Sequence, residues 1–269
     1  MTVALQWMDH RCAVEAPPPV ARALGALFPA LMVPAHVGDV ADVRVTARGD
    51  GWLVRPGPAD PCPSVPDTVS AAELAITRHL LASDRAHCHL HTAGAVTDSG
   101  GAVLAVGPSG SGKSTVAYAW HGLGRPLLGD DVVALDPTGR AHPFQRPLKV
   151  DADRLREAGV DPATTTAWDG ETDDVWVDPT AGAGWAGAAS VILVAELRFE
   201  AGAPLRLDPL EGGERLRVLL NSVHQTGVSR AGSVDRLISV AEAGPMVRVT
   251  HGNGREAAAA LLELTTRCR

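Results

Sequence analysis

Two short stretches carry residue types that proteins use to hold phosphate and metal ions. The first, AVLAVGPSGSGKST at residues 102–115, contains the pattern G-x-x-x-x-G-K-[ST] between an apolar run and a predicted helix. Its glycines allow backbone shapes that a Cβ would obstruct, so successive N–H groups can surround a phosphate at the start of that helix. The pattern predicts a nucleoside triphosphate site. Its expected contacts are Gly107, Pro108, Ser109, Gly110, Ser111, Gly112, Lys113, Ser114 and Thr115.

Individual side chains of this stretch have expected roles. Lys113 would reach the β and γ phosphates, and the Ser114 hydroxyl would bind Mg²⁺. The alternative is a glycine- and serine-rich turn that only joins a strand to a helix. The strand, loop and helix all occur in order, and this favours the nucleotide site.

The second stretch is RPLLGDDVVALD, in which an acid pair follows a short apolar run. One predicted helix separates it from Lys113, so the chain would return to the sheet with Leu127 and Leu128 in a strand. Asp130 and Asp131 would then lie at the carboxyl end of that strand, where α/β sheets bind ligands. One acid could hold Mg²⁺ while the other accepts the proton of an attacking hydroxyl. A solvated Asp-Asp turn is the alternative.

Three histidines alternate in HCHLH, residues 87–91. In a strand, His87, His89 and His91 share one face, because side chains alternate with period two. Such a set could bind zinc, although a fourth ligand is not evident. We favour a second interpretation, in which His91 faces the phosphate pocket while His87 and His89 pack or meet solvent further back.

The elements that position these residues divide the chain at about residue 82. Residues 1–82 are predicted to form a small N-terminal α/β subdomain, and residues 83–269 are predicted to form a P-loop catalytic domain. A Gly-Asp-Gly hairpin is expected within residues 43–57. In the first part we expect helices over 19–32 and 70–83, the second with Ser70 as N-cap and Glu73 three residues later. In the second part we expect strands within 86–96, 102–106, 190–199, 203–210 and 245–252, and helices over 213–225 and 254–268.

Composition excludes several classes of protein. The formal net charge is −7 and no basic run occurs, which argues against nucleic acid as a partner. No apolar run approaches the ~18 residues of a membrane span. The cysteines are dispersed and form no CxxC pair, which predicts a reduced, cytoplasmic protein.

His91, VGPSGSGKST and LLGDD together resemble the catalytic core of the HPr kinase/phosphorylase family. The resemblance covers residues 86–136. The layout, including HPFQRPLKV, is more similar to HPr-kinase-related proteins found with lasso and other ribosomal peptide clusters. The resemblance implies an α/β fold with a P-loop kinase core of the HPr kinase C-terminal type. It also implies that Asp130 is the general base and that Asp131 is a metal ligand or a water-positioning partner. His91 would lie near Asp130 and influence its protonation.

The expected activity is that of an ATP- and Mg²⁺-dependent, serine-kinase-like phosphotransferase. Its acceptor would be a hydroxyl of a ribosomally made peptide such as a lasso peptide. Two alternatives stay open: a kinase for a small hydroxyl compound, and a nucleotide-binding regulator or ATPase switch. Arg146 and Lys149 could bind an acidic substrate or the γ phosphate, or be solvated charges. A homo-oligomer is also left open.

Overall fold

The computed structural model describes residues 1–36, 38–151, 153, 166–168, 174–226 and 230–267, and these form two compact units of mixed α/β structure. Unit 1 contains residues 1–84 together with the described parts of 145–153 and 161–178. Unit 2 contains 85–144 and the described residues from 179 onward. The predicted boundary at 82 lies close to the first change of unit. The prediction placed all of residues 83–269 in the catalytic domain. The described parts of 145–153 and 161–178 belong instead to unit 1.

The main sheet of unit 1 has five strands in the order β3-β1-β2-β4-β5. Its two-residue loop between β4 and β5 is the Gly-Asp-Gly hairpin predicted from the sequence, with Arg48 opposite Gly51. Gly49 has a φ of 61°, a backbone conformation that a hairpin loop requires and glycine adopts without strain. The strands are β1 (Thr2–Trp7), β2 (His10–Glu15), β3 (Met32–Val33), β4 (Val43–Arg48) and β5 (Gly51–Arg55).

Two helices belong to unit 1, α1 (Pro18–Leu27) and α2 (Val65–Ser83). The expected N-cap at Ser70 is wrong, because α2 begins five residues earlier. Ser64 is the N-cap, and its Oγ accepts a hydrogen bond from the Asp67 N–H at 3.2 Å. Ser64 has the spacing to an acid that a capping box needs, since Asp67 lies three residues later.

A three-stranded sheet in the order β11-β13-β12 completes unit 1. Arg146, just before this sheet, forms an ion pair with Glu73 of α2 at 3.2 Å, and both side chains are largely buried. Lys149 lies over the Trp176 ring, 5.6 Å from its centre. These contacts give Arg146 and Lys149 structural partners inside unit 1. The strands are β11 (Leu148–Asp151), β12 (Thr166–Trp168) and β13 (Asp174–Val177).

We expect Arg146→Ala to lower the free energy of unfolding by about 2–3 kcal/mol, because it leaves the buried Glu73 carboxylate without its ion pair. Urea unfolding measures the change. The control is Arg44→Ala in the exposed pair with Glu15, where we expect a loss below about 1 kcal/mol. Equal losses in the two variants would contradict this role for Arg146.

Unit 2 is built on a nine-stranded sheet. Its strands are β6 (Cys88–Val96), β7 (Ala102–Val106), β8 (Leu127–Gly129), β9 (Val132–Leu135), β10 (Arg140–Pro143), β14 (Ala189–Phe199), β15 (Arg206–Pro209), β16 (Val223–Thr226) and β17 (Met246–His251). The expected strands are confirmed, and β7 is fully buried as its apolar sequence predicts. β7 is parallel to β14 but antiparallel to β6.

Two long strands connect the parts of this sheet. The first half of β6 pairs with β9 and β16, and its second half pairs with β7 and β8. β14 pairs with β10 at its start, then with β7 and β17. The path β10-β9-β6-β7-β14 therefore closes on itself through the β10–β14 pairing. The carboxyl ends of β7 and β8 therefore lie against the middle of β6, where Val106 is opposite Thr92 and Gly129 is opposite Gly94.

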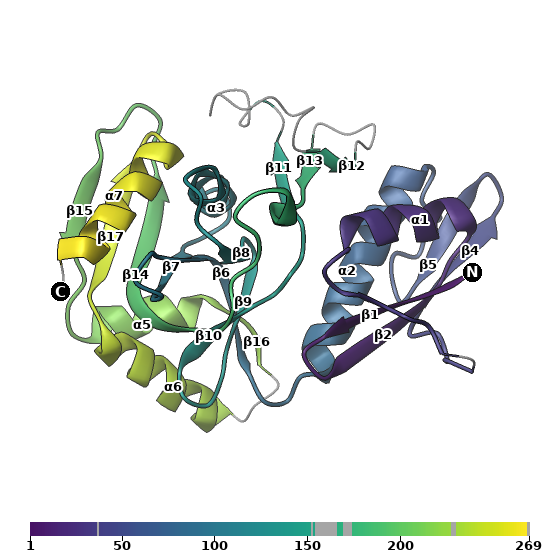
Figure 1. Ribbon diagram of the computed structural model, residues 1–269, viewed down its shortest axis with the longest axis horizontal. Coiled ribbons are helices and arrows are strands. Elements are labelled where there is room, and N and C mark those ends of the chain that lie inside the picture. Colours follow the sequence, from purple (N-terminus) through teal and green to yellow (C-terminus); the bar gives the residue numbers. More distant parts are fainter. Residues whose placement is uncertain (37, 152, 154–165, 169–173, 227–229, 268–269) are drawn as a thin grey trace. The chain divides into compact units, whose positions relative to one another are not determined.

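The helices of unit 2 are α3 (Lys113–Gly122), α5 (Gly213–Asn221), α6 (Arg230–Ala243) and α7 (Gly254–Arg267). α3 and α7 are in contact, and α5 and α6 contact each other below the sheet in the view of Figure 1. The buried Trp120 Nε1 donates a hydrogen bond to the Ala258 carbonyl oxygen at 3.1 Å, which fixes α3 against α7. The sequence did not predict α6. Among the described residues, no helix is long and apolar enough to cross a membrane.

The turn between β9 and β10 is organised by one carboxylate, that of Asp136. Its Oδ1 accepts hydrogen bonds from the Thr138 and Arg140 N–H groups at 2.8 and 3.0 Å. Its Oδ2 lies 3.0 Å from His142 Nε2. Burial by itself would raise the pKa of Asp136, but the hydrogen bonds from His142, Thr138 and Arg140 outweigh it and hold this pKa well below its usual range.

This lowered pKa predicts a pH-dependent stability difference between the wild type and Asp136→Asn. A carboxyl whose pKa is lower in the folded state stabilises the protein above its unfolded pKa of about 3.9. That contribution is lost as the pH falls through the lower folded value. Urea unfolding at a series of pH values measures this difference. At pH 7 we expect the free energy of unfolding of the wild type to exceed that of the variant by about 1–3 kcal/mol, and this difference should shrink below about pH 4. A gap independent of pH would contradict this explanation.

Candidate functional site

The glycine-rich loop, residues 107–112, joins β7 to α3. Gly107, Gly110 and Gly112 have φ angles of 150°, 79° and 95°. A Cβ on Gly107 would lie 2.7 Å from the Ser111 Oγ, closer than any real side chain could approach without a shift. The loop backbone therefore takes a shape that depends on glycine at these positions.

Lys113 is the first residue of α3, and its side chain is buried and folded back onto the loop. Its Nζ donates hydrogen bonds to the carbonyl oxygens of Gly107 at 2.8 Å and Pro108 at 2.9 Å. Gly112 is the N-cap in the left-handed conformation, and the first turn of this helix has no side-chain cap. The N–H groups of that turn are therefore not capped by a side chain of the protein, as an anion-binding helix start requires.

The remaining predicted contacts surround the same loop. Pro108, Ser109 and Gly110 form an exposed crest, while Ser114 and Thr115 are half-buried in the first turn of α3. The Thr115 methyl group packs against the start of α7, where a Cβ added to Gly254 would lie 2.8 Å from it.

The acid pair lies between β8 and β9, immediately after Gly129, the last residue of β8. A Cβ on Gly129 would lie 2.3 Å from the Val132 carbonyl oxygen, so only glycine fits there. β8 pairs with β6 through Gly94 opposite Gly129. Asp130 is buried, whereas the Asp131 side chain keeps about 30% of its surface exposed. The predicted position at the carboxyl end of a short strand is confirmed.

His91 is paired with the second acid. In the β6–β9 register His91 lies opposite Val132, and Asp131 directly precedes Val132 in the chain. His91 Nδ1 lies 2.8 Å from Asp131 Oδ1, and the Thr92 N–H donates to the Asp131 carbonyl oxygen at 3.2 Å. The sequence predicted His91 near Asp130; the ion pair described here is with the neighbouring Asp131, and the relation of His91 to Asp130 stays a prediction.

Electrostatics connects the acid pair to the loop. Burial lowers the pKa of Lys113, while the negative charges of Asp131 and Asp130 act on it in the opposite direction. The acids are thus close enough to influence the lysine through their charge. One region of unit 2 brings together Lys113, Asp130, Asp131 and His91.

The other two histidines of HCHLH have different surroundings. His89 is completely buried in β6, opposite Ala134 of β9. The His87 ring lies 5.2 Å from the His142 ring in an edge-on arrangement. Within the described parts of the chain, the three histidines do not form a group with metal-ligand spacing. The zinc alternative for this strand therefore gains no support.

His251 contacts the loop and was missed by the sequence analysis. This residue ends β17, is 1% exposed, and its Nε2 donates a hydrogen bond to the Ser111 carbonyl oxygen at 3.2 Å. Its ring is so close to the loop that a Cβ on Gly112 would lie 2.9 Å from it. Its other face meets Phe199 of β14 edge-on. No local pattern identifies His251, because only the order β7-β14-β17 brings it near the loop.

For the nucleotide that the sequence predicts at this loop, we expect His251→Ala to raise KM about 2–10-fold with little change in kcat. The reason is that one hydrogen bond that orients the loop is worth about 0.5–1.5 kcal/mol. His251→Gln keeps an N–H donor and should recover part of the affinity. Steady-state kinetics separates the two constants. A fall in kcat at unchanged KM would contradict a role in shaping the loop.

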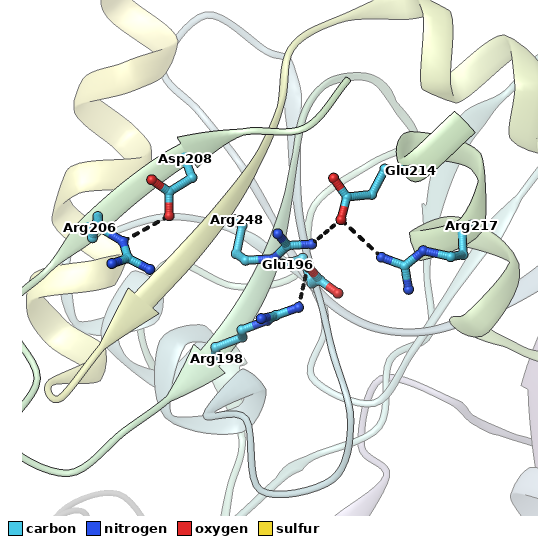
Figure 2. Close-up of polar contacts among 7 residues, drawn as sticks. All are labelled: Glu196, Arg198, Arg206, Asp208, Glu214, Arg217 and Arg248. Atoms are coloured by element: carbon cyan, nitrogen blue, oxygen red, sulfur yellow. Dashed lines mark hydrogen bonds and ion pairs between the residues drawn. The ribbon is translucent and has the colours of Figure 1, made fainter. Parts of the chain in front are cut away.

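A network of ion pairs fixes the strand ends beside the loop (Figure 2). Arg248 of β17 donates to Glu196 of β14 and to Glu214 of α5, each at 2.6 Å. The hydrogen bond from Arg248 holds the pKa of Glu214 below its usual value. Glu196 is in register with Val106, the last residue of β7 before the loop. The network therefore ties β14, β17 and α5 together next to the loop. Figure 2 also shows Arg198, Arg206, Asp208 and Arg217 around it.

Comparisons with known proteins give little direct guidance. No family model matches the chain, and no curated protein matches it. Solved structures do match, among them the HPr(Ser) kinase/phosphatase from Coxiella burnetii, with a TM-score of 0.36 and 14% identity over 66% of this chain and 88% of that one. At this score and identity the likeness carries no argument about function, which must be drawn from the site itself.

Proposed function

We propose that this protein is an ATP- and Mg²⁺-dependent kinase that transfers a phosphoryl group to a hydroxyl. The observation that carries the proposal is the convergence of four groups in unit 2. Lys113 at the start of α3 feels the charges of Asp131 and Asp130, and Asp131 is paired with His91. A lysine at a helix start beside two carboxylates is a set of groups that P-loop enzymes of phosphoryl transfer use together with Mg²⁺.

The loop residues fit a nucleoside triphosphate. Gly107 and Gly112 keep open the space that a Cβ would take from Ser111 and His251. The Ser111 Oγ is buried and has no hydrogen-bond partner among the described residues, so it is a candidate donor toward a phosphate. The uncapped first turn of α3 supplies further N–H donors. When bound, ATP supplies the γ-phosphoryl group for transfer.

Oxygen ligands for Mg²⁺ come from the same place. The Ser114 hydroxyl and the Asp131 carboxylate would hold the ion, since Mg²⁺ prefers oxygen ligands and retains several waters. The ion pair with His91 orients the Asp131 carboxylate, as partners of metal-binding carboxylates commonly do. His91 is therefore assigned as a positioning residue.

Asp130 is assigned as the general base, which would accept the proton of the attacking hydroxyl. The new oxygen–phosphorus bond would form as the bond from the γ phosphorus to the β–γ bridging oxygen breaks, and ADP would leave. Lys113 balances the negative charge that spreads over the transferring group. The proposed acceptor is a serine hydroxyl of a ribosomally made peptide such as a lasso peptide. This acceptor class rests on the layout of the sequence, including HPFQRPLKV at residues 142–150, which is similar to that of HPr-kinase-related proteins of peptide clusters.

Labelled ATP tests the proposal when it is incubated with Mg²⁺ and a serine-containing lasso peptide, or with the same peptide carrying alanine. We expect label to appear on the serine peptide only. Transfer to small hydroxyl compounds but not to peptides would favour the small-molecule alternative. Release of free phosphate at the same rate with and without any acceptor would favour an ATPase switch and overturn the kinase assignment.

A further inference from the structure

Unit 1 contains a group of potential metal ligands that takes no part in the proposed kinase site. The Cys12 Sγ, a carboxylate oxygen of Asp42 and a ring nitrogen of His79 all lie within 4.8 Å of one another. Cys12 belongs to β2, Asp42 directly precedes β4, and His79 belongs to α2. Three elements of one unit thus present a thiol, a carboxylate and an imidazole to a common point.

The backbone fixes one of the three ligands in place. The Asp42 N–H donates to the Ala13 carbonyl oxygen at 2.8 Å, and Asp42 Oδ2 accepts from the Ala13 N–H at 2.8 Å. These two bonds clamp Asp42 along β2 and leave its other oxygen, Oδ1, 3.7 Å from His79 Nε2. This carboxylate is therefore held in position by the strand itself.

The distance between two of the ligand atoms suits a tetrahedral ion. Zinc bonds of about 2.0–2.3 Å to nitrogen, oxygen and sulfur place ligand atoms roughly 3.3–3.8 Å apart. The 3.7 Å between His79 Nε2 and Asp42 Oδ1 falls in this range. His79 Nε2 also lies 3.3 Å from the Arg11 carbonyl oxygen, so that oxygen or a water could occupy the fourth position.

We infer that Cys12, Asp42 and His79 form a zinc site that links β2, the segment before β4 and α2. Zinc fits this donor set better than Mg²⁺ or Ca²⁺ does, because thiolate and imidazole are ligands that zinc prefers and the harder cations avoid. Cys12 is completely buried, while Asp42 is exposed and His79 partly exposed. The ion would therefore enter from the surface, on the side of Asp42 and His79, and bind the buried thiol beneath them.

Zinc binds a thiolate rather than a thiol, so the Cys12 thiol must lose its proton when the ion binds. A bound zinc ion would stabilise the thiolate and separate it electrostatically from Asp42. Zinc binding should therefore release the Cys12 proton to the solvent.

Cobalt(II), a spectroscopic substitute for zinc, tests the site in the full-length protein after chelator treatment. Excess Mg²⁺ is included to occupy sites made of oxygen ligands. We expect one equivalent of cobalt to produce a thiolate-to-metal charge-transfer band that zinc then abolishes. Cys12→Ser should remove the band. Cys62→Ser, at another buried cysteine of unit 1, should keep it and is the matched control.

The partly exposed ligand provides a second variant that tests the site with little disturbance of the core. His79→Gln should weaken zinc binding by more than the ~10–100-fold typical of an outer-shell change, with an unchanged circular dichroism spectrum. No charge-transfer band in the wild type would overturn the inference. A band that persists in Cys12→Ser would also overturn it. The same holds if the band is lost in His89→Gln but kept in His79→Gln. None of these outcomes depends on kinase activity.

Discussion

Asp130→Asn is expected to slow phosphate transfer by roughly 10²–10⁴-fold, the contribution typical of a positioned general base. Asparagine keeps the shape of the buried side chain but cannot accept the proton of the attacking hydroxyl. The nucleotide should still bind, because the loop and Lys113 are unchanged. Single-turnover transfer of labelled phosphate, together with a separate measurement of nucleotide affinity, distinguishes the two effects.

Two comparison variants sharpen this test. Asp131→Asn should raise the Mg²⁺ concentration needed for half-maximal transfer, because Asp131 is the proposed metal ligand. Asp235→Asn, at an exposed position on α6, should leave the rate unchanged. If Asp131→Asn abolished transfer at every Mg²⁺ concentration while Asp130→Asn remained active, the roles of the two acids would have to be exchanged.

Lys113→Met is expected to reduce the transfer rate by about 10²–10³-fold, as removal of a single group that stabilises transition-state charge commonly does. Methionine keeps much of the length of the lysine stem in its buried position but carries no charge. It also loses the two hydrogen bonds to the Gly107 and Pro108 carbonyl oxygens. Nucleotide affinity and transfer should therefore both fall, whereas Asp130→Asn affects transfer alone.

Lys113→Arg serves as the matched variant for this prediction. It keeps the positive charge, but the rigid guanidinium cannot reproduce the compact contacts of the ammonium group. We expect it to recover part of the nucleotide affinity and little of the transfer rate. Circular dichroism and thermal unfolding confirm that each variant is folded. Wild-type transfer by Lys113→Met would remove the lysine from the mechanism.

Local patterns predicted the parts of the site that lie within one short stretch. The apolar run of β7, the glycines of the loop and the start of α3 follow one another directly, so their order fixed the strand, loop and helix. The short strand that precedes Asp130 and Asp131 was also predicted, because a single helix separates it from the loop. In each of these cases the residues that matter are neighbours in the chain, and their types determine the local backbone.

Contacts that depend on strand order were not predicted. The pairing of His91 with Asp131 follows from the β6–β9 register, and a shift of one residue would present a different neighbour. His251 reaches the loop only because β17 lies beside β14. Likewise, Arg146 joins unit 1 through a buried ion pair with Glu73, which no spacing along the chain reveals.

A crystal structure with a non-hydrolysable ATP analogue and Mg²⁺ would test most directly whether the acid pair serves a bound nucleotide. We predict that the phosphates lie against the backbone of residues 107–115, with the ion held by Ser114 and Asp131 and the Asp130 carboxylate turned toward the terminal phosphate. Phosphates bound elsewhere, or both carboxylates turned toward bulk water and away from the terminal phosphorus, would contradict the proposed function.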